Sequence, residues 1–515
     1  MLSSGNPQGP VLLVAAPIMY TFPFSFAYLA GYLQQHGENV RLLFRSVPAE
    51  QLAQQIINQK PLLVGFGNLY PELKEIKEII SMLDRAGRNF PVIIGGQMVS
   101  PIPEFAVKTT GADIGAIGEA EITLFKVAQA LREGKDVATV AGLAIRNGDN
   151  VVLTGEGEYI MDLKDLPSIP FELFPVDRWL PVGRWYAAFV SRSHWRYDDR
   201  VIPVHGGRGC PFKCNFCYHH SQFRMRPIDA VIAETASAIE RFDGNFLDIS
   251  DDLVLSSPKR AEELIAGLKK LPRPVEYYLS AHFDIIARMS DSMLQELRAS
   301  GCRTVGPGYE SGSDRILKLI GKKFTAETIL TQTERLKNAG IKAIGNFMIG
   351  QHTETLEDAE ATLDLMRKTL AIDPDIEYTF SIMTPFPGSP LYALAKEQGL
   401  IKDDRDFYDK YFEGGGIFDW RLIANLSAMT DRQIFDGYAR MQHEYGMIKD
   451  AAFGRRLRRI TFLKKVAGQV NYRLDKYIWS KSSHLNIFRK TGDTLCGMAM
   501  RPLERIELKI RNKSV

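Results

Sequence analysis

Three of the five cysteines in this 515-residue chain lie within eight positions, at Cys210, Cys214 and Cys217. Thiolates are good ligands for zinc and for iron. A structural zinc ion takes four protein ligands, whereas a four-iron cluster held by three thiolates keeps one iron free for a small molecule. The Cys-x3-Cys-x2-Cys spacing is neither the paired Cys-x2-Cys of a zinc ribbon nor a thioredoxin dithiol. The spacing therefore favours an iron–sulfur cluster, with a structural metal knuckle or three buried thiols as the alternatives.

The residues around these cysteines, Gly-Gly-Arg-Gly-Cys-Pro-Phe-Lys-Cys-Asn-Phe-Cys from Gly206 to Cys217, resemble the signature of the radical S-adenosylmethionine (SAM) enzymes. That signature has an aromatic residue before its last cysteine, and Phe216 stands there. The resemblance implies that the three cysteines form the catalytic centre and hold a 4Fe-4S cluster, whose unique iron binds SAM through its amino and carboxylate groups. It also implies release of a 5′-deoxyadenosyl radical and an electron donor such as flavodoxin or ferredoxin.

A strand has to deliver this loop, and the apolar run 201–204 directly precedes it. Further apolar runs follow at 246–250, 276–280, 303–306, 343–349 and 376–383, with helical segments between them. Six strand–helix units predict a partial parallel (β/α)6 barrel, open on one side for a large substrate. Chemistry in such barrels collects at the carboxyl ends of the strands.

Polar residues follow the expected strands at those ends: Asp251 and Asp252, then His282 and Asp284, then Gly308, Tyr309, Glu310 and Ser311, then Gly350 and Glu354. The segment 306–313 resembles the part of the family that meets the ribose and methionine end of SAM. The segment 345–350, with Gly345, Ile349 and Gly350, resembles the turn that contacts adenine, and 384–390 resembles the Pro-rich exit of the sixth strand. Each segment alone also fits a capping or turn motif. Asp251-Asp252 stands where many members carry Gly-Gly-Glu, which leaves the contact to the methionine amino group open there.

The first 150 residues alternate short apolar runs with amphipathic segments. Runs lie at 11–16, 40–44, 62–67, 92–96 and 114–117, and helices are expected at 24–36, 49–58, 71–86 and 102–109. This rhythm predicts an α/β domain with a doubly wound parallel sheet, which binds ligands at the carboxyl ends of its strands. Glycines there let a bulky ligand approach the backbone. The candidates for such contacts are Gly65, Gly67, Gly95, Gly96, Gln97, Gly118 and Glu119.

No Gly-x-Gly-x-x-Gly follows the first run, which disfavours a dinucleotide. The segments 26–33, 92–96 and 118–121 instead resemble the Rossmann-like cobalamin-binding domain found ahead of many radical SAM domains. The resemblance implies that cobalamin binds. The Asp-x-His-x-x-Gly motif of other cobalamin proteins is absent, so cobalt should lack a histidine ligand from that motif. The alternative is a flavodoxin-like domain that binds nothing.

Length and composition predict a folded protein of several domains, because 45% of the residues are hydrophobic and 24% are charged. We expect a cobalamin-binding domain at 1–150, a linker at 151–200, the barrel at 201–395 and a helical basic region at 396–515. No apolar run reaches the roughly 18 to 20 residues of a membrane span, and no basic n-region opens the chain. Localisation is therefore expected to be cytoplasmic.

The tail from Arg455 to Val515 carries 16 Lys and Arg against four acidic residues, a net charge of about +12. Basic and apolar residues mix at near-helical spacing at 455–466. Such a segment can lie on an anionic membrane surface, which would make the enzyme peripheral at the inner face of the membrane. It can also be a solvated helix face packed on the barrel by its apolar stripe. Nucleic-acid binding is the least favoured of the three.

The whole constellation is similar to the cobalamin-dependent radical SAM enzymes over roughly residues 11–395. Their commonest activity implies methylation of an unactivated carbon of a small substrate, with one SAM methylating cobalamin and another supplying the radical. A hydrophobic substrate would suit a membrane-docked tail. Two alternatives remain: an anaerobic oxidative cyclase of magnesium-protoporphyrin monomethyl ester, and an iron–sulfur redox sensor or scaffold. The sequence itself does not name the substrate.

The membrane interpretation of the tail predicts that the full chain co-sediments with anionic vesicles. Each basic residue near an anionic leaflet contributes about 1 kcal/mol. Binding should weaken as salt rises, because screening shortens the range of the attraction. Truncation before Arg455 should abolish binding and leave the cluster intact. A full chain that ignores vesicles, together with an insoluble truncated protein, would show instead that the tail is structural.

Overall fold

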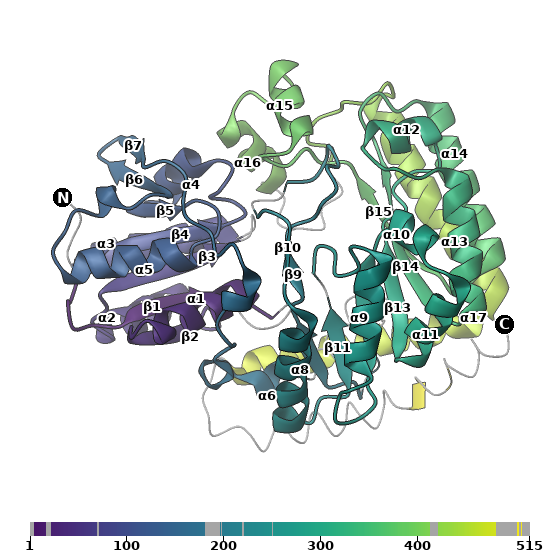
Figure 1. Cartoon of the computed structure of the whole chain (residues 1–515). Coiled ribbons are helices and arrows are strands. Elements are labelled where there is room, and N and C mark those ends of the chain that lie inside the picture. The colour runs from purple at the N-terminus through teal and green to yellow at the C-terminus, as the bar shows by residue number, and fades with distance from the viewer. Residues whose placement is uncertain are drawn as a thin grey trace. The chain divides into compact units, whose positions relative to one another are not determined.

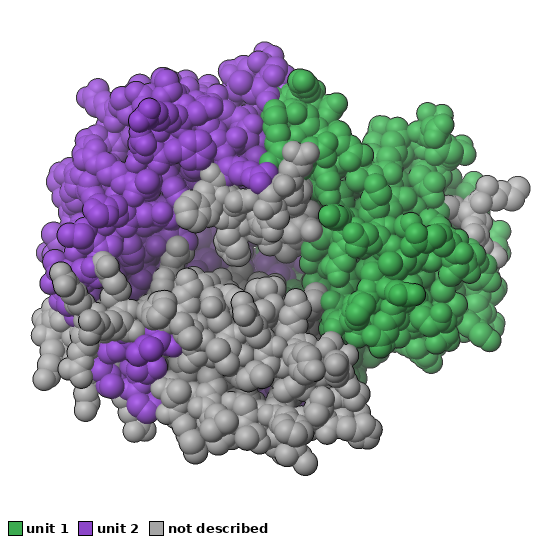
Figure 2. Space-filling model, turned by 180° about the vertical axis from the view of Figure 1, so that it is seen from behind, with its two compact units in different colours: residues 1–176, 218–224, 401–419 green, residues 177–217, 225–400, 420–515 purple. Residues whose placement is uncertain are grey.

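The computed structural model of the chain describes residues 5–16, 22–68, 72–180, 196, 198–218, 221–249, 251–412 and 421–479, with 502, 503 and 506 (Figure 1). The chain divides into two units, coloured in Figure 2. Unit 1 comprises residues 1–176, 218–224 and 401–419, and unit 2 comprises 177–217, 225–400 and 420–515. The chain therefore enters unit 1 directly after Cys217 and again after Leu400. The domain boundaries expected from the sequence stay a prediction.

Unit 1 is built on a seven-stranded sheet in the order β2-β1-β3-β4-β5-β6-β7. The first five strands pair in parallel, and β6 and β7 continue the sheet antiparallel. The strands are β1 (Val11–Ala15), β2 (Val40–Phe44), β3 (Leu63–Asn68), β4 (Val92–Gly96), β5 (Ile114–Ala116), β6 (Leu143–Asn147) and β7 (Asn150–Leu153). The helices are α1 (Phe24–Gln35), α2 (Ala49–Asn58), α3 (Leu73–Arg85), α4 (Pro103–Thr110), α5 (Glu121–Arg132) and α16 (Asp404–Phe412), with short turns η2 (Val137–Thr139), η3 (Leu163–Asp165) and η4 (Phe171–Leu173).

This arrangement confirms the doubly wound α/β domain. All five expected strands and all four expected helices form, to within two residues at each end. Strand β1 lies between β2 and β3, so the order in which successive strands are added changes direction between β1 and β3. Ligands of doubly wound sheets bind at this switch point. The expectation omitted α5 and the antiparallel pair β6 and β7.

Alternation along the strands explains the core of unit 1. Leu12 and Val14 of β1 and Val64 and Phe66 of β3 point to one face, because successive strand side chains lie on opposite sides. They pack against buried residues of α2, α3 and α4. Helices α1 and α5 contact each other and cover the other face (Figure 1). The sheet is thus closed on both faces, which leaves its edges and strand ends for ligands.

Unit 2 contains a six-stranded sheet in the order β15-β14-β13-β12-β11-β8, with every pair parallel. This is the expected partial barrel of six strands. Its strands are β8 (Val201–Val204), β11 (Phe246–Ile249), β12 (Glu276–Ala281), β13 (Cys302–Pro307), β14 (Lys342–Ile349) and β15 (Glu377–Ile382). Its helices are α8 (Ile228–Phe242), α9 (Pro258–Leu268), α10 (Phe283–Arg288), α11 (Asp291–Ala299), α12 (Asp314–Leu319), α13 (Ala326–Asn338), α14 (Leu356–Ile372), α15 (Pro390–Glu397) and α17 (Asp431–Trp479). The remaining short elements are α6 (Val176–Trp179), β9 (Gly207–Arg208) and β10 (Arg224–Met225).

Side-chain caps fix where the barrel helices begin. The hydroxyls of Ser257, Ser290 and Ser313 each accept a backbone N–H of the helix that follows. Thr325 and Thr355 form capping boxes with Thr328 and Asp358. A cap satisfies N–H groups that lack a partner within the helix and is worth about 1 kcal/mol. The loops between strand ends and helices therefore have fixed lengths.

Helix α17 extends from Asp431 to Trp479, so the basic region is helical as far as residue 479. Gly454, with φ 74° and ψ 162°, interrupts the helix just before the basic segment. Its first part packs on α14, β14 and β15. None of the helices within the described residues combines the length and the apolar character needed to cross a bilayer.

Candidate active site

The cysteine loop, residues 206–217, follows β8 at the carboxyl edge of the unit 2 sheet. Its three cysteines are partly buried, and the Cys217 N–H donates to the Cys214 carbonyl at 3.1 Å. Neighbouring elements fasten its last turn. Asn215 donates from its backbone to the Ile320 carbonyl at 3.3 Å and from its side chain to the Leu319 carbonyl at 3.2 Å. The structure therefore brings the three predicted ligands together on one loop that the end of α12 supports.

The thiols repel one another as anions. Burial raises the pKa of all three above the usual value, and that of Cys217 reaches about 12. Charge on Cys214 raises the pKa of the other two further. Among the described residues, no three His, Cys, Asp or Glu side chains converge at a point suited to one metal ion. Since the thiolate is the form that binds metal, metal binding to these cysteines would release their protons.

An aromatic stack holds the first half of the loop. The His282 ring, directly after β12, lies on the Phe212 ring with centroids 3.7 Å apart and planes within 15°. His282 is 6% exposed, and neither ring nitrogen has a hydrogen-bond partner among the described residues. Burial, together with the charges of Lys322 and Arg288, lowers its pKa to about 3. His282 is therefore a neutral ring that positions Phe212, two residues after Cys210.

Asp251, directly beyond β11, holds the start of the loop. Its Oδ2 accepts the Gly206 N–H at 2.7 Å, and its Oδ1 has no hydrogen-bond partner among the described residues. Burial raises its pKa to about 8, although the Gly206 N–H and the nearby guanidinium groups of Arg226 and Arg260 lower it. Asp252 is exposed. The first of the two predicted aspartates thus binds the backbone of the cysteine loop as a neutral acid.

Glu310 follows β13 in the left-handed conformation, with φ 61°. Its backbone is fixed by β14, since its N–H donates to Asn346 and its carbonyl accepts from Met348, at 2.8 and 2.9 Å. Its carboxylate accepts from the Lys322 ammonium at 3.0 Å. A Cβ on Gly308 would come within 2.3 Å of Glu310 Oε1, so the glycine is required for this carboxylate position.

Gly345 and Gly350, predicted as cofactor contacts, have structural reasons to be glycine in and after β14. A Cβ on Gly345 would lie 2.2 Å from the Tyr309 ring, so this residue is a glycine because a buried aromatic packs there. Ile349 is fully buried. Gly350 has φ +85° and donates to Glu354 Oε2 at 2.5 Å, and the Gln351 N–H donates to the same oxygen at 2.9 Å. Burial raises the Glu354 pKa to about 7.

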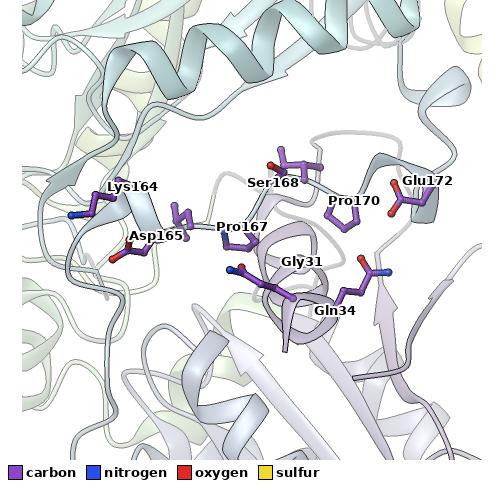
Figure 3. A pocket seen from close by; sticks show the side chains of 11 residues that line it. Gly31, Gln34, Lys164, Asp165, Pro167, Ser168, Pro170 and Glu172 are labelled. Carbon is purple, nitrogen blue, oxygen red and sulfur yellow. The ribbon is translucent and has the colours of Figure 1, made fainter. Parts of the chain in front are cut away.

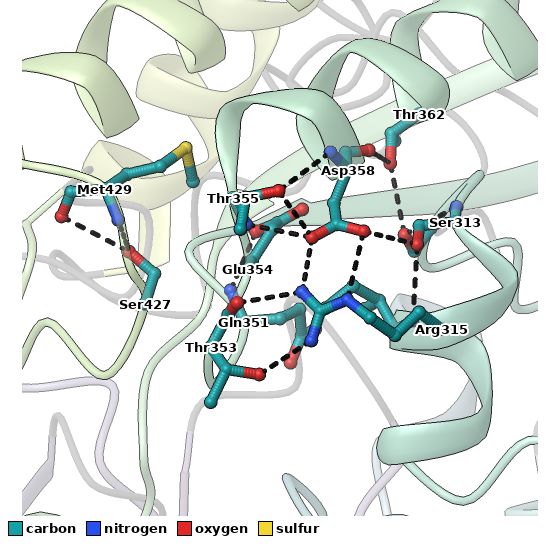
Figure 4. A network of polar contacts seen from close by, with 12 residues as sticks. Ser313, Arg315, Gln351, Thr353, Glu354, Thr355, Asp358, Thr362, Ser427 and Met429 are labelled. Carbon is teal, nitrogen blue, oxygen red and sulfur yellow. Dashed lines mark hydrogen bonds and ion pairs between the residues drawn. The ribbon is translucent and has the colours of Figure 1, made fainter.

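One carboxylate joins the exits of β13 and β14 (Figure 4). Asp358 accepts from the Ser313 hydroxyl at 2.6 Å, from the Thr355 hydroxyl at 2.8 Å and from Arg315. Burial acts to raise the Asp358 pKa, but the bonds from Arg315 and Ser313 hold it well below its usual range. Ser311 belongs to the same region, because its hydroxyl lies 3.1 Å from that of Thr362 on α14. The segments expected to contact SAM therefore form one hydrogen-bonded assembly.

In unit 1 the predicted glycines lie within β3 (Gly65 and Gly67), at the end of β4 (Gly95 and Gly96) and after β5 (Gly118), on strands that pair in parallel. A Cβ on Gly67 would meet the Phe26 ring at 2.7 Å, and one on Gly65 the Leu13 side chain at 3.1 Å, so packing requires small residues there. Gly95 is different, since its nearest neighbour would be the Ala116 Cβ at 3.8 Å. Gly96 has φ +106°, and Gln97 is exposed. The end of β4 is thus open to a ligand.

Glu119 lies in the loop after β5, beside Gly118, whose φ is +78°. Its carboxylate forms a buried ion pair with Arg224. Arg224 also donates to the Ile160 carbonyl and lies 5.9 Å from the centre of the Tyr159 ring. Arg224 ends the segment 218–224 that follows the last cysteine, so this pair holds that segment in unit 1.

A surface pocket of about 780 Å³ lies in unit 1 (Figure 3). It is lined by α1 and by the segment that runs over it, residues Gly31, Gln34, Gln35, Lys164, Asp165, Leu166, Pro167, Ser168, Ile169, Pro170 and Glu172. None of these residues was predicted as a site residue.

Comparison with known proteins gives the family. Residues 204–366 match the Radical SAM superfamily, and residues 10–128 match the B12 binding domain. The protein is a cobalamin-binding radical SAM enzyme. Its cofactors are accordingly a 4Fe-4S cluster, SAM and cobalamin.

Relatives include both methyltransferases and cyclases. An uncharacterised methyltransferase of Pyrococcus horikoshii is 25% identical over 388 residues, covering 74% of this chain and 79% of that protein. The anaerobic magnesium-protoporphyrin IX monomethyl ester cyclase of Rubrivivax gelatinosus is 23% identical over 400 residues, covering 76% of this chain and 68% of that protein. Both alignments extend beyond either family match alone.

Two solved structures share the fold. TsrM of Kitasatospora setae, with cobalamin and a 4Fe-4S cluster bound, has a TM-score of 0.60 at 19% identity over 76% of this chain and 75% of its own. The radical SAM enzyme OxsB, with aqua-cobalamin bound, has a TM-score of 0.67 at 14% identity over 98% of this chain and 81% of its own. The second likeness extends over nearly the whole chain.

The residues of this radical SAM enzyme fit an iron–sulfur cluster. Three sulfur donors lie on one loop, partly buried and close enough to influence one another's pKa. A buried ammonium, Lys322, lowers the pKa of Cys214 and so favours its thiolate. Sequence reasoning missed Lys322, Phe212 and Arg224. Lys322 reaches the site from an element distant in sequence, whereas Phe212 lies inside the cysteine motif and its ring partner His282 comes from a separate strand end.

Replacing Asp251 by Asn tests whether the Asp251 carboxyl, which binds the start of the cysteine loop, is protonated in the folded protein. The Asp251 pKa is about 8 in the folded protein, against about 3.9 in an unfolded chain. The folded state therefore holds the extra proton between about pH 4 and 8, so wild-type stability falls as pH rises through this window and levels off above it. Asn keeps the bond to Gly206 without this loss. Relative to wild type, its free energy of unfolding should gain about 1.4 kcal/mol per pH unit between about pH 5 and 7.

The measurement is urea unfolding of wild type, D251N and the exposed control D252N at several pH values. D252N should follow the wild-type trend. Parallel trends for wild type and D251N would contradict a neutral Asp251.

Proposed function

We propose that Cys210, Cys214 and Cys217 hold the 4Fe-4S cluster of this enzyme. The observation that carries the proposal is that these thiols share one partly buried loop at the carboxyl edge of the parallel barrel, inside the radical SAM match. Asn215, Phe212 and Gly206 tie that loop to three different elements. These bonds fix the backbone on both sides of the thiols, and Phe216 precedes the last of them.

We propose that the exits of β13 and β14 bind SAM. Gly308, Glu310 and Ser311 would meet its ribose and methionine end, and Gly345, Ile349 and Gly350 would form the adenine side, in part through backbone. The buried carboxylate of Glu310 beside the cysteine loop supports this assignment. Asp251 would act by holding Gly206, and exposed Asp252 remains a candidate for direct contact.

We propose that cobalamin binds at the ends of β3, β4 and β5, against Gly65, Gly67, Gly95, Gly96 and Gln97, with Gly118 and Glu119 beside them. Open backbone at Gly95 supports a bulky planar ligand there. The protein lacks the Asp-x-His-x-x-Gly motif, so we expect no histidine from it on cobalt.

The reaction we propose is methylation of an unactivated carbon of a small molecule. With the cluster and SAM held at the barrel and cobalamin at the unit 1 sheet, radical hydrogen abstraction and methyl transfer would be the chemistry that these groups supply. The chain's own residues would orient the reactants and keep water out. The methyltransferase relative and the two domain matches support this reaction. A TsrM structure holds its substrate tryptophan, which supports a small-molecule acceptor.

The second candidate is an oxidative cyclase, favoured by the Rubrivivax relative. Product mass separates the two reactions: methylation adds one CH2, whereas cyclisation gives a new keto-bearing ring. If reduction with SAM yields no 5′-deoxyadenosine at all, the protein is instead an iron–sulfur sensor or scaffold.

The partners follow from this chemistry. We propose a flavodoxin or ferredoxin as electron donor, because the cluster must be reduced once per radical. We propose that the basic region after Gly454 contacts an anionic membrane surface and that the protein is otherwise cytoplasmic. The four-part division at 150, 200 and 395 is kept as a proposal.

Replacing Cys210, Cys214 and Cys217 together by Ala should remove the bound iron, since no other thiolates of the loop remain. The anaerobically reconstituted protein should lose its brown absorbance and form no 5′-deoxyadenosine. Cys302→Ala is the matched control, because that thiol is fully buried in β13 and should not affect iron content. Retention of about four irons by the triple variant would refute the ligand assignment.

Hydroxocobalamin should bind the full chain, and the Co(II) form should show no nitrogen superhyperfine splitting in electron paramagnetic resonance. Gly95→Leu should weaken binding at least tenfold, because the added side chain has room in the protein yet occupies the proposed face. Nitrogen splitting would show an axial base. Unchanged cobalamin affinity in folded Gly95→Leu would exclude this edge of the sheet.

A further inference from the structure

Lys322 is a buried cation beside the cysteine loop. Its side chain is 6% exposed, and its Nζ lies 3.0 Å from Glu310 Oε1. The ammonium also lies 5.9 Å from the Phe216 ring centre and 5.8 Å from that of Phe324. Burial alone would lower the Lys322 pKa, but Glu310 and then Cys214 raise it above its usual value. The side chain is therefore a permanent positive charge in a largely apolar site.

The backbone around Lys322 is fixed against the same loop. Lys322 N–H donates to Leu317 at 2.9 Å, at the end of α12. Gly321, with φ +88°, lies so close that an added Cβ would be 2.9 Å from the Lys213 carbonyl oxygen. With Asn215 bonded to residues 319 and 320, the loop and the turn that carries Lys322 form one contact. The turn that carries Lys322 is therefore held against the cysteine loop, and the bond to Glu310 holds its ammonium.

A cation and an anion lie beside the cysteine loop. The Lys322 ammonium lies 5.9 Å from the ring centre of Phe216, the residue before Cys217, and 3.0 Å from the Glu310 carboxylate. Water screens a charge poorly at a buried position, so the effect of each charge is larger than at the surface. One buried cation and one buried anion thus act on the sulfur ligands with opposite signs.

We propose that Lys322 sets the reduction potential of the cluster, raising it by placing a positive charge against the sulfur ligands. The proposal rests on the assignment of the cluster to Cys210, Cys214 and Cys217. Reduction adds one negative charge to a cluster already bound by thiolates, and a fixed cation stabilises the reduced state more than the oxidised one. Net charge and exposure are among the factors that set such potentials. The negative charge of Glu310 lowers the reduction potential, so the potential depends on both charges of the pair.

The test is the midpoint potential of the reconstituted cluster in the full chain, followed by electron paramagnetic resonance during an anaerobic redox titration without SAM. Lys322→Met should lower the ratio of reduced to oxidised cluster at a fixed potential at least tenfold, which is about 59 mV for one electron. Lys323→Met is the matched control, because it removes the same charge from the neighbouring exposed residue. It should shift the potential far less. Glu310→Gln should shift it upward.

Equal potentials for Lys322→Met and Lys323→Met would overturn the proposal. If Lys322→Met does not retain iron, its potential cannot be measured. Lys322→Arg, which keeps the positive charge, is then the variant to test. Iron retained with a near wild-type potential in Lys322→Arg, but lost in Lys322→Met, supports a need for the charge. Loss of iron from both variants means that the side chain is structural and the proposal fails. Loss of iron in the triple cysteine variant is a separate readout, so the two assignments can fail independently.

Discussion

The site depends on bonds that other elements supply to the cysteine loop. Most of the cysteine loop beyond β9 lies outside helices and strands, so its polar backbone groups need partners from other elements, because unpaired buried groups are costly. The Asp251 carboxyl holds Gly206, the His282 ring supports Phe212, and the end of α12 receives Asn215. These supports come after β11, β12 and β13. The geometry of the cysteines is thus set by the whole barrel, and a parallel sheet suits this because all its strands end at one edge.

The buried acids at the carboxyl edge of the unit 2 sheet are of two kinds, neutral and ion-paired. Asp251 and Glu354, whose pKa values are raised to about 8 and about 7, accept backbone N–H groups and need no counter-charge when protonated. Glu310 is instead paired with Lys322. Neutral acids can hold backbone without adding to the negative charge of the thiolates, which are already hard to form in a buried place.

The strands and most helices could be predicted from the sequence, because apolar periodicity and the N-terminal caps are local. Cys210, Cys214 and Cys217 were equally accessible, since their spacing is itself the motif. The antiparallel pair β6 and β7 was missed, although Asn147-Gly148-Asp149 between two apolar runs is itself a local hairpin signal. Lys322 was missed because it looks like any surface lysine until α12 folds against the loop. Gly345 shows the converse, since its motif position suggested a ligand and the structure adds the Tyr309 ring as a reason for glycine.

The shared carboxylate of Asp358 has a consequence for how such enzymes diverge. It binds Ser313 and Arg315 after β13 and Thr355 after β14, so a substitution that moves one turn also moves the other. Descendants of an ancestral enzyme would therefore inherit both turns together or lose both. Changes in substrate specificity would then accumulate in segments that Asp358 does not join, such as the exit of β15. The same reaction could in this way act on other substrates after substitutions in a few segments alone.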